Sequence, residues 1–256
     1  MNLAILQARM SSSRLPNKVL KKVNNKELLA YECERILKSK KIDKLIIATS
    51  KDIGDDKIEE FGIINRIEVF RGSLDDVLGR YYECATKFKD KHKNLNIVRI
   101  TGDCPVIDPI VIDEVIKVFE NEKYDYVSNT LKPTYPDGMD IEVCSFNVLK
   151  DAYNNATLKS EREHVTLYIK NNNKFKKFNY EAKVDFSHLR LTVDEQKDFD
   201  LIQNILENLY PKNKDFSYMD IVSYMTLNPN LFFINSDIPR DEGLKKSLKE
   251  DERYYK

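Results

Sequence analysis

Short apolar runs alternate with helical patterns through the first half of the chain, and this alternation restricts the fold more than any other feature. The strand-like runs cover residues 3–8, 44–49, 67–70, 96–100 and 124–128, and the helical patterns between them cover residues 26–38, 55–61, 74–88 and 109–119. Such alternation favours a mostly parallel sheet with helices on both faces. We therefore predict a three-layer, Rossmann-like α/β fold.

The rhythm changes after residue 130. Pro133, Pro136, Asp137 and Gly138 predict a turn or a projecting hairpin. Later patterns predict strands over residues 139–143, 174–180 and 189–193 and an amphipathic helix over residues 195–210. Because no linker rich in Gly, Ser or Pro interrupts the chain, we predict a single domain over residues 1–256, with an insertion at about 130–190.

Two helix starts are marked by capping residues. Ser73 precedes a helical pattern whose first turn is acidic, so it is a candidate N-cap. Asp108 followed by Pro109 predicts an N-cap with proline at the first helical position.

Opposite charges balance, since 42 Lys and Arg residues face 42 Asp and Glu residues. General binders of nucleic acid or of membrane surfaces carry a basic excess, so we expect neither partner and regard any basic site as local. Arg9 and Arg14 interrupt the N-terminus before a signal peptide could form, and no apolar run is long enough for a transmembrane helix. These features predict a cytoplasmic protein.

Several cofactor and metal classes lack their motifs. Neither G-x-G-x-x-G nor G-x-x-x-x-G-K-[ST] occurs, which argues against dinucleotide-dependent and P-loop chemistry. The cysteines form no C-x-x-C pair and the three histidines form no spaced ligand set, so neither a disulfide framework nor a zinc site is expected. Buried thiols are predicted at Cys33, Cys84, Cys104 and Cys144.

The first strand leads into a basic loop. Arg9, Arg14 and Lys18 lie in this loop together with the hydroxyls of residues 11–13. Arginine can donate paired hydrogen bonds to phosphate oxygens, and lysine supplies a mobile point charge. Ligands of open α/β sheets bind at the carboxyl ends of strands, where this loop begins. The loop is therefore a candidate triphosphate site, with a solvated surface loop as the alternative.

Two aspartates also follow predicted strands. Asp103 lies in a Gly-Asp turn after the fourth strand, and Asp194 follows the run at 189–193. Magnesium is typically bound by one or two carboxylates together with substrate phosphates, so this pair could hold one metal ion. The alternatives are a simple tight turn at Asp103 and a helix cap at Asp194.

Three further segments are weaker candidates. In residues 70–80 a strand, a glycine and a helix start could contact a ligand, and the acidic Asp75 and Asp76 favour a neutral base over a phosphate there. The predicted hairpin carries three acidic residues that are candidates for a site. The run at residues 161–164 is another candidate, and the alternative interpretation of this run is a charged helix face. Cys104 has no identifiable partner histidine and is treated as a packing thiol.

Together these segments resemble the spore-coat-polysaccharide-type cytidylyltransferases, which are relatives of the acylneuraminate and 3-deoxy-manno-octulosonate cytidylyltransferases. The matching segments run nearly end to end in the family's order: QARMSSSRLPNKVL (7–20), RGS (71–73), DDVL (75–78), RYY (80–82), TGDCP (101–105), IDP (107–109), YPDGMDIE (135–142), EREHVT (161–166), LTVD (191–194), RDEG (240–243) and KSLKED (246–251).

The resemblance implies a GT-A-like nucleotidyltransferase fold with CTP as donor and Mg²⁺ as cofactor. It implies that Arg9, Arg14 and Lys18 act in catalysis on the triphosphate, and that Asp103 and Asp194 hold the metal. The implied nucleotide-binding set is Gln7, Ala8, Arg9, Ser11, Ser12, Ser13, Arg14, Lys18, Thr49, Gly72, Ser73, Asp76, Thr101, Gly102 and Asp103. The implied border of the acceptor site or of a dimer contact is Asp137, Asp140, Glu142, Arg162 and His164, and a homodimer is expected.

The chain departs from the family at two loop positions. Ser11 and Asn17 stand where the family usually has glycine. The Cβ of Ser11 restricts a close approach of backbone to phosphate, whereas Asn17 tolerates unusual dihedral angles better than most residues.

The expected activity is transfer of CMP from CTP to a small anionic sugar, sugar phosphate or polyol phosphate, with release of pyrophosphate, in the synthesis of surface-polysaccharide precursors. One alternative is a GT-A-type glycosyltransferase that uses a nucleotide sugar, although residues 101–103 lack the first aspartate of a D-x-D motif. The other is a non-catalytic nucleotide-binding module. The sequence does not identify the acceptor.

Overall fold

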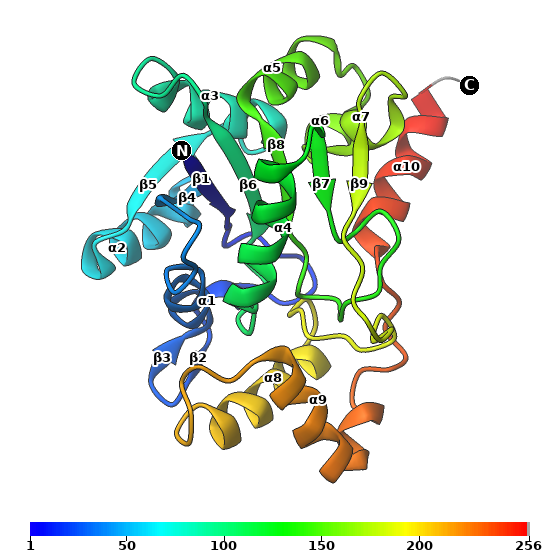
Figure 1. Ribbon diagram of the computed structural model, residues 1–256. Helices are drawn as coiled ribbons and strands as arrows, with labels where there is room; N and C mark the ends of the chain where they lie inside the picture. Colours follow the sequence, from blue (N-terminus) through cyan, green and yellow to red (C-terminus); the bar gives the residue numbers. More distant parts are fainter. Residues whose placement is uncertain (255–256) are drawn as a thin grey trace.

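A seven-stranded sheet forms the centre of the computed structural model, which describes residues 1–254 (Figure 1). Its strand order is β5-β4-β1-β6-β8-β7-β9. These strands are β1 (Asn2–Gln7), β4 (Lys44–Ser50), β5 (Glu68–Gly72), β6 (Asn96–Thr101), β7 (Tyr126–Ser128), β8 (Glu142–Ser145) and β9 (Lys177–Asn179), and a separate ribbon pairs β2 (Lys22–Val23) with β3 (Lys26–Glu27).

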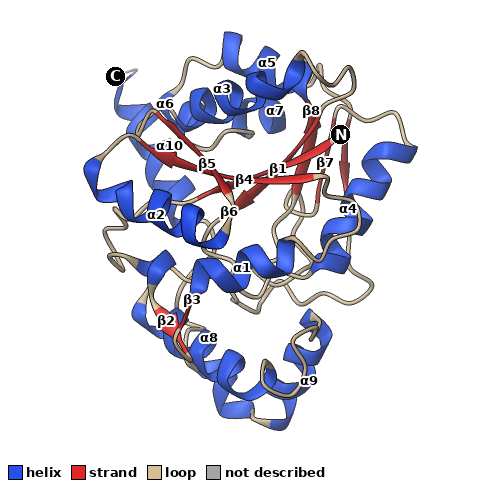
Figure 2. Ribbon diagram, turned by 90° about the vertical axis from the view of Figure 1, so that its left-hand side faces the viewer, coloured by secondary structure: helices blue, strands red, loops and turns tan. Residues whose placement is uncertain are grey.

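Helices cover both faces of this sheet (Figure 2). They are α1 (Leu28–Ile36), α2 (Asp56–Asn65), α3 (Val77–Lys89), α4 (Pro109–Asn121), α5 (Phe146–Asn155), α6 (Lys159–Glu163), α7 (Leu167–Asn171), α8 (Gln196–Leu209), α9 (Tyr218–Leu227) and α10 (Glu242–Tyr254), with 3₁₀ turns η1 (Lys18–Leu20), η2 (Ile53–Asp55) and η3 (Pro229–Phe233). The predicted strands of the first half are β1, β4, β5, β6 and β7, so the three-layer α/β fold is confirmed.

The sheet is mostly parallel. Strands β1, β4, β5 and β6 run in one direction, and β8 is antiparallel to both of its neighbours, β6 and β7. Alternate side chains of β1 enter different cores: Ala4 and Leu6 pack on the side of α1, α2, α4 and α8, whereas Leu3 and Ile5 pack on the side of α3 and α5. A strand buried on both faces explains why the opening run is continuously apolar.

The segment after residue 130 differs from the predicted projecting hairpin. Gly138 does form a turn, with φ +103°, but β8 then pairs with the main sheet and β9 pairs in parallel with β7. The apolar side chains of these strands become buried because the strands join the main sheet and extend it. Residues 189–193 form no strand and contribute a single bridge between Asp137 and Arg190.

The predicted caps fare differently. Asp108 caps α4, because its side chain accepts from the N–H of Ile110, and Pro109 is the first helical residue. Ser73 is not the N-cap of α3: Asp76 takes that position and accepts from the N–H of Gly79 (2.8 Å), while Ser73 caps the preceding turn by accepting from the N–H of Asp76.

All four cysteines are free and buried, as predicted. Within residues 1–254, none of the helices combines the length and the apolar character needed to cross a membrane.

Candidate active site

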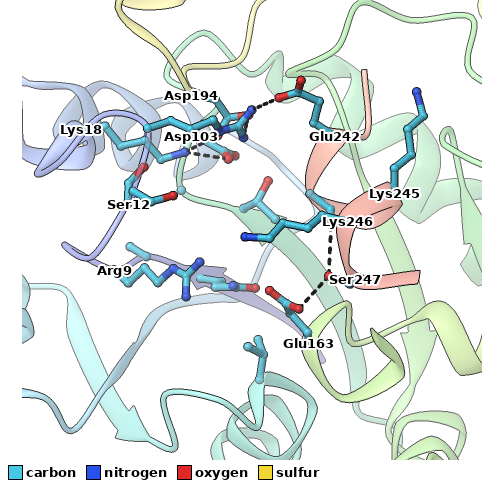
Figure 3. Close-up of a pocket in the computed structure, with 18 of the residues that line it drawn as sticks. Arg9, Ser12, Lys18, Asp103, Glu163, Asp194, Glu242, Lys245, Lys246 and Ser247 are labelled. Carbon is cyan, nitrogen blue, oxygen red and sulfur yellow. Dashed lines mark hydrogen bonds and ion pairs between the residues drawn. The ribbon is translucent and has the colours of Figure 1, made fainter. Parts of the chain in front are cut away.

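A cleft of about 920 Å³ opens at the carboxyl ends of β1 and β6 (Figure 3). One wall consists of the loop after β1, the turn after β6 and the start of α3. The opposite wall comes from α6 and α10. The lining residues on the sheet side are Gln7, Ala8, Arg9, Ser12, Ser13, Arg14, Lys18, Val19, Leu74, Asp75, Val77, Thr101, Gly102, Asp103 and Asp194.

Lys18 joins the two predicted metal-binding aspartates. Its Nζ lies 3.2 Å from Asp103 Oδ2 and 2.8 Å from Asp194 Oδ1 (Figure 3). Arg14 Nη2 lies 3.0 Å from the other oxygen of Asp194. The structure therefore gathers at one point two cations of the first loop, Arg14 and Lys18, and the two carboxylates of distant segments.

The parallel pairing of β1 with β6 explains this meeting. Gln7 lies opposite Thr101, so both loops leave the sheet at the same edge. The N–H of Gly102 donates to the carbonyl of Gln7 (2.7 Å), and a Cβ at Gly102 would lie 2.8 Å from that oxygen, so the turn requires glycine. The carbonyl of Asp103 accepts from Val193 N–H (2.8 Å) and Thr192 Oγ1 (3.0 Å), which fixes the segment carrying Asp194.

The basic loop is held by its own backbone and by one buried carboxylate. Asp55 Oδ1 accepts from the N–H of Met10 (2.7 Å), and the carbonyl of Met10 accepts from the N–H groups of Ser12 and Asn17. Asn17 adopts a left-handed conformation with φ 59°. Asparagine is one of the few residues that adopt this region readily, so it can replace the glycine that is usual at this position.

Lys18 and the aspartates of this cluster stabilise one another's charged forms. Burial by itself would lower the pKa of Lys18, but Asp103 and Asp194 together raise it above its usual value. Burial would likewise raise the pKa of Asp194, but Lys18, Arg14 and Arg190 lower it to about 2. Both groups are therefore charged at neutral pH.

The donor set suits a divalent cation bound together with phosphates. Asp103 and Asp194 already contact one cationic atom, the Lys18 ammonium, so their oxygens can reach a common ion. Within the described residues no group of three or more His, Cys, Asp or Glu side chains could hold a metal. Two carboxylates with the remaining positions left to substrate oxygens are what magnesium prefers.

Other predicted nucleotide-binding residues lie away from the lining. Ser11 is exposed outside the cleft, and Thr49 is fully buried in β4. Gly72, Ser73 and Asp76 are also not among the lining residues, whereas Leu74, Asp75 and Val77 of the same segment are. Asp194 is not the cap of α8, since Glu195 takes that position with Asp198.

The predicted acceptor-border residues are engaged in ion pairs or hydrogen bonds. Arg162 pairs with Asp76. Asp137 pairs with Arg190 (2.7 Å) and Asp140 with Arg240 (2.6 Å). None of the five border residues lines the cleft in the described part of the chain; His164 Nε2 lies 3.0 Å from Ser247 Oγ, which does line it.

Glu142 is the centre of a buried polar network. It accepts from Arg99, Tyr126 and Thr166, and Lys170 Nζ lies 3.3 Å from it. Burial would raise the pKa of Glu142, but Lys170 and Arg99, with hydrogen bonds from Thr166 and Tyr126, lower it to about 2.

This network predicts acid sensitivity. A folded-state pKa below the unfolded value of about 4.3 stabilises the protein fully above that pH, and the contribution is lost as the pH falls toward 2. We expect Glu142→Gln to be less stable at pH 7 and to lose less further stability between about pH 5 and pH 2 than the original protein. Urea unfolding across this range measures both effects, with the exposed Glu122→Gln as control. Parallel stability–pH curves for Glu142→Gln and the original protein would contradict the prediction.

Sequence reasoning missed one wall of the cleft. It is formed by Lys159, Glu163, Pro239, Glu242, Gly243, Lys245, Lys246, Ser247, Lys249 and Glu250. Arg14 Nη1 pairs with Glu242 Oε2 (2.7 Å) across the cleft. The only signal for this wall was that the segments at 161–166 and 240–251 match the family pattern. No residue pattern within these segments indicates that they pack opposite the basic loop.

Comparison with known proteins relates the chain to one family. A family model described as cytidylyltransferase matches residues 3–235. The chain is 38% identical to the uncharacterized protein MJ1063 of Methanocaldococcus jannaschii, covering 92% of this chain and 95% of that protein. It is 34% identical to the spore coat polysaccharide biosynthesis protein SpsF of Bacillus subtilis, covering 89% and 95%. A solved cytidylyltransferase structure from Leptospira borgpetersenii superposes with a TM-score of 0.84 at 32% identity, covering 90% and 96%.

Proposed function

This chain belongs to the cytidylyltransferase family, and on that premise we propose that it transfers CMP from CTP to a small anionic acceptor, a sugar, sugar phosphate or polyol phosphate, and releases pyrophosphate. The membership makes it a CTP-dependent nucleotidyltransferase. The name of the Bacillus subtilis relative supports an acceptor destined for surface polysaccharide.

One observation carries the proposal: Lys18, Arg14, Asp103 and Asp194 meet at the edge of the sheet where such folds bind ligands. Arg9 lines the same cleft, so a magnesium triphosphate that enters here would meet three cations of the loop and two carboxylates.

The chain's own residues would act mainly by alignment and charge neutralisation, as phosphoryl transfer requires. The guanidinium groups of Arg9 and Arg14 would hold phosphate oxygens, and Lys18 would stabilise the charge that grows on the departing pyrophosphate. An anionic oxygen of the acceptor forms the new bond to the α-phosphorus, and the bond to the β-phosphate oxygen breaks with its electron pair on pyrophosphate. Asp103 and Asp194 would hold Mg²⁺, which when bound supplies positive charge to the phosphates.

Pyrophosphate release tests the activity. The purified protein is incubated with Mg²⁺, CTP and a library of sugar acids, sugar phosphates and polyol phosphates, and pyrophosphate and the CMP-linked product are measured. A CTP-selective rise in melting temperature among the four nucleoside triphosphates is expected first. Release of a free nucleoside diphosphate from a nucleotide sugar would instead indicate a glycosyltransferase, and CTP binding without turnover a non-catalytic module.

Lys18→Ala supplies the matched variant. We expect kcat to fall by on the order of 10²–10³, because a fixed cation at the departing group is removed. The melting temperature should change little, because Asp194 keeps Arg14 and Arg190 as partners at 3.0 and 2.9 Å. Lys22→Ala, an exposed lysine nearby, is the control. A large loss of melting temperature with kcat preserved would mean that Lys18 is structural.

The dimer and the cytoplasmic location stay predictions.

A further inference from the structure

Helix α10 faces the basic loop across the cleft and is docked through polar groups. Ser247 Oγ donates to Glu163 Oε2 (2.8 Å), and Asp251 Oδ1 accepts from the N–H of Ser160 (3.2 Å). Ser247 and Asp251 are the buried residues of this helix over residues 242–252, whereas Leu248 is 38% exposed. Hydrogen bonds, rather than a deep apolar face, therefore set the position of the helix against α6.

The charges on this wall do not cancel. Glu242 pairs with Arg14 (2.7 Å) and Glu250 with Lys159 (2.8 Å). Glu163 is the remaining carboxylate among the lining residues of α6 and α10, which include the four lysines Lys159, Lys245, Lys246 and Lys249. Lys245 Nζ donates to the carbonyl of Arg240 (3.2 Å), but in the described part of the chain neither Lys246 nor Lys249 has an ion-pair partner.

Lys246 of α10 reaches into the cleft (Figure 3). Figure 3 shows its side chain directed toward the space between Asp103 and Arg9, whereas Lys245 turns away from that space. Lys249 is three residues further along the helix, on the same face. Two ammonium groups without an ion-pair partner among the described residues lie on one face of this helix. They repel each other and attract anions, so this face suits a negatively charged ligand.

We propose that Lys246 binds an oxyanion group, phosphate or carboxylate, of the acceptor substrate. This inference rests on the proposed function. Arg9, Arg14 and Lys18 already provide the cations for the triphosphate on the sheet side, so the charge of Lys246 is available for a second anion. An acceptor held at α10 lies across the cleft from the triphosphate, as transfer between two bound substrates requires.

Anion binding to the full-length protein tests the inference without knowledge of the acceptor. The protein is saturated with Mg²⁺ and α,β-methylene-CTP, which fills the triphosphate site, and is then titrated with inorganic phosphate or acetate by calorimetry. We expect Lys246→Ala to weaken binding of the preferred anion by about tenfold or more, because a charge-assisted hydrogen bond is lost. Whether phosphate or acetate binds better distinguishes a phosphate-bearing acceptor from a sugar acid.

Lys245→Ala is the matched control. It removes the same charge from the same helix, so general electrostatic attraction falls equally, but we expect anion affinity within about twofold of the original protein, as for exposed charges without a specific contact. Lys246→Arg should retain binding, since the charge and donors remain.

Three outcomes would overturn the inference. They are unchanged anion binding in Lys246→Ala, equal losses in Lys246→Ala and Lys245→Ala, and an equal loss of affinity for the CTP analogue itself, which would assign Lys246 to the triphosphate. Failure of the original protein to bind the CTP analogue is a different result, because it would contradict the proposed function first.

Discussion

Replacement of Asp103 by asparagine is expected to abolish nucleotidyl transfer and to leave the fold intact. The change removes one of the two carboxylates that would hold Mg²⁺ and also removes the negative charge that pairs with Lys18 at 3.2 Å. Loss of preorganised charge at a phosphoryl-transfer site costs on the order of 10²–10³ in rate for one donor, and a metal ligand should cost at least as much.

The fold should survive because Asp103 holds its neighbouring segment through its backbone and not through its carboxylate. Its carbonyl accepts from Val193 and Thr192, and asparagine leaves both hydrogen bonds in place. The measurements are pyrophosphate release, the Mg²⁺ dependence of CTP binding, and melting temperature. Asp185→Asn, an exposed aspartate, is the control. Near-normal turnover by Asp103→Asn would contradict the assignment of the metal ligands.

Replacement of Arg190 by methionine is expected to give the largest loss of stability. Arg190 lies 2.7 Å from Asp137, 2.9 Å from Asp194 and 3.0 Å from Asp198, and its side chain is 8% exposed. Removing one member of a buried ion-pair group costs about 3–5 kcal/mol, because Asp137 and the fully buried Asp198 would lose their ion-pair partner. For a chain of this size that corresponds to a fall in melting temperature of roughly 6–20 °C.

Two further variants separate this mechanism from a simple loss of packing. Arg190→Met combined with Asp198→Asn removes the fully buried carboxylate as well and should recover part of the loss. Arg71→Met is the control with solvent-exposed partners, since Asp56 and Glu59 are 51% and 47% exposed and surface pairs contribute about 0–1 kcal/mol. Equal shifts for Arg190→Met and Arg71→Met would show that burial of the charges does not govern the effect.

Much of the fold follows from local pattern. The strand runs at 3–8 and 96–100 are apolar at every buried position, and such runs in alternation with helices have few arrangements other than a parallel sheet. The same rule placed the candidate site, because loops at the carboxyl ends of adjacent parallel strands share one edge. The sequence therefore predicted that Arg14, Lys18 and Asp103 lie close together before their contacts were known.

The errors arose where local pattern is ambiguous. Ser73 and Asp76 are both good caps, and the choice between them depends on Gly79, where the N–H lies 2.8 Å from Asp76 Oδ1. Residues 139–143 alternate like a strand with one exposed face, but Glu142 of the polar face is only 3% exposed because Arg99, Tyr126 and Thr166 surround it. Alternation shows that a strand has two faces, and it does not show which neighbour covers them.

The sequence alone determined the β1 loop, the turn at Asp103 and the carboxylate at Asp194, because each depends on residues close together in the chain. Only the tertiary structure showed that Lys18 bridges two carboxylates 85 and 176 residues away, and that Arg14 meets Glu242 across 228 residues. Contacts of that range depend on how every intervening element packs. The position of helix α10 at the site was therefore known only from the structure, because the periodicity of a short charged helix does not specify the surface against which it packs.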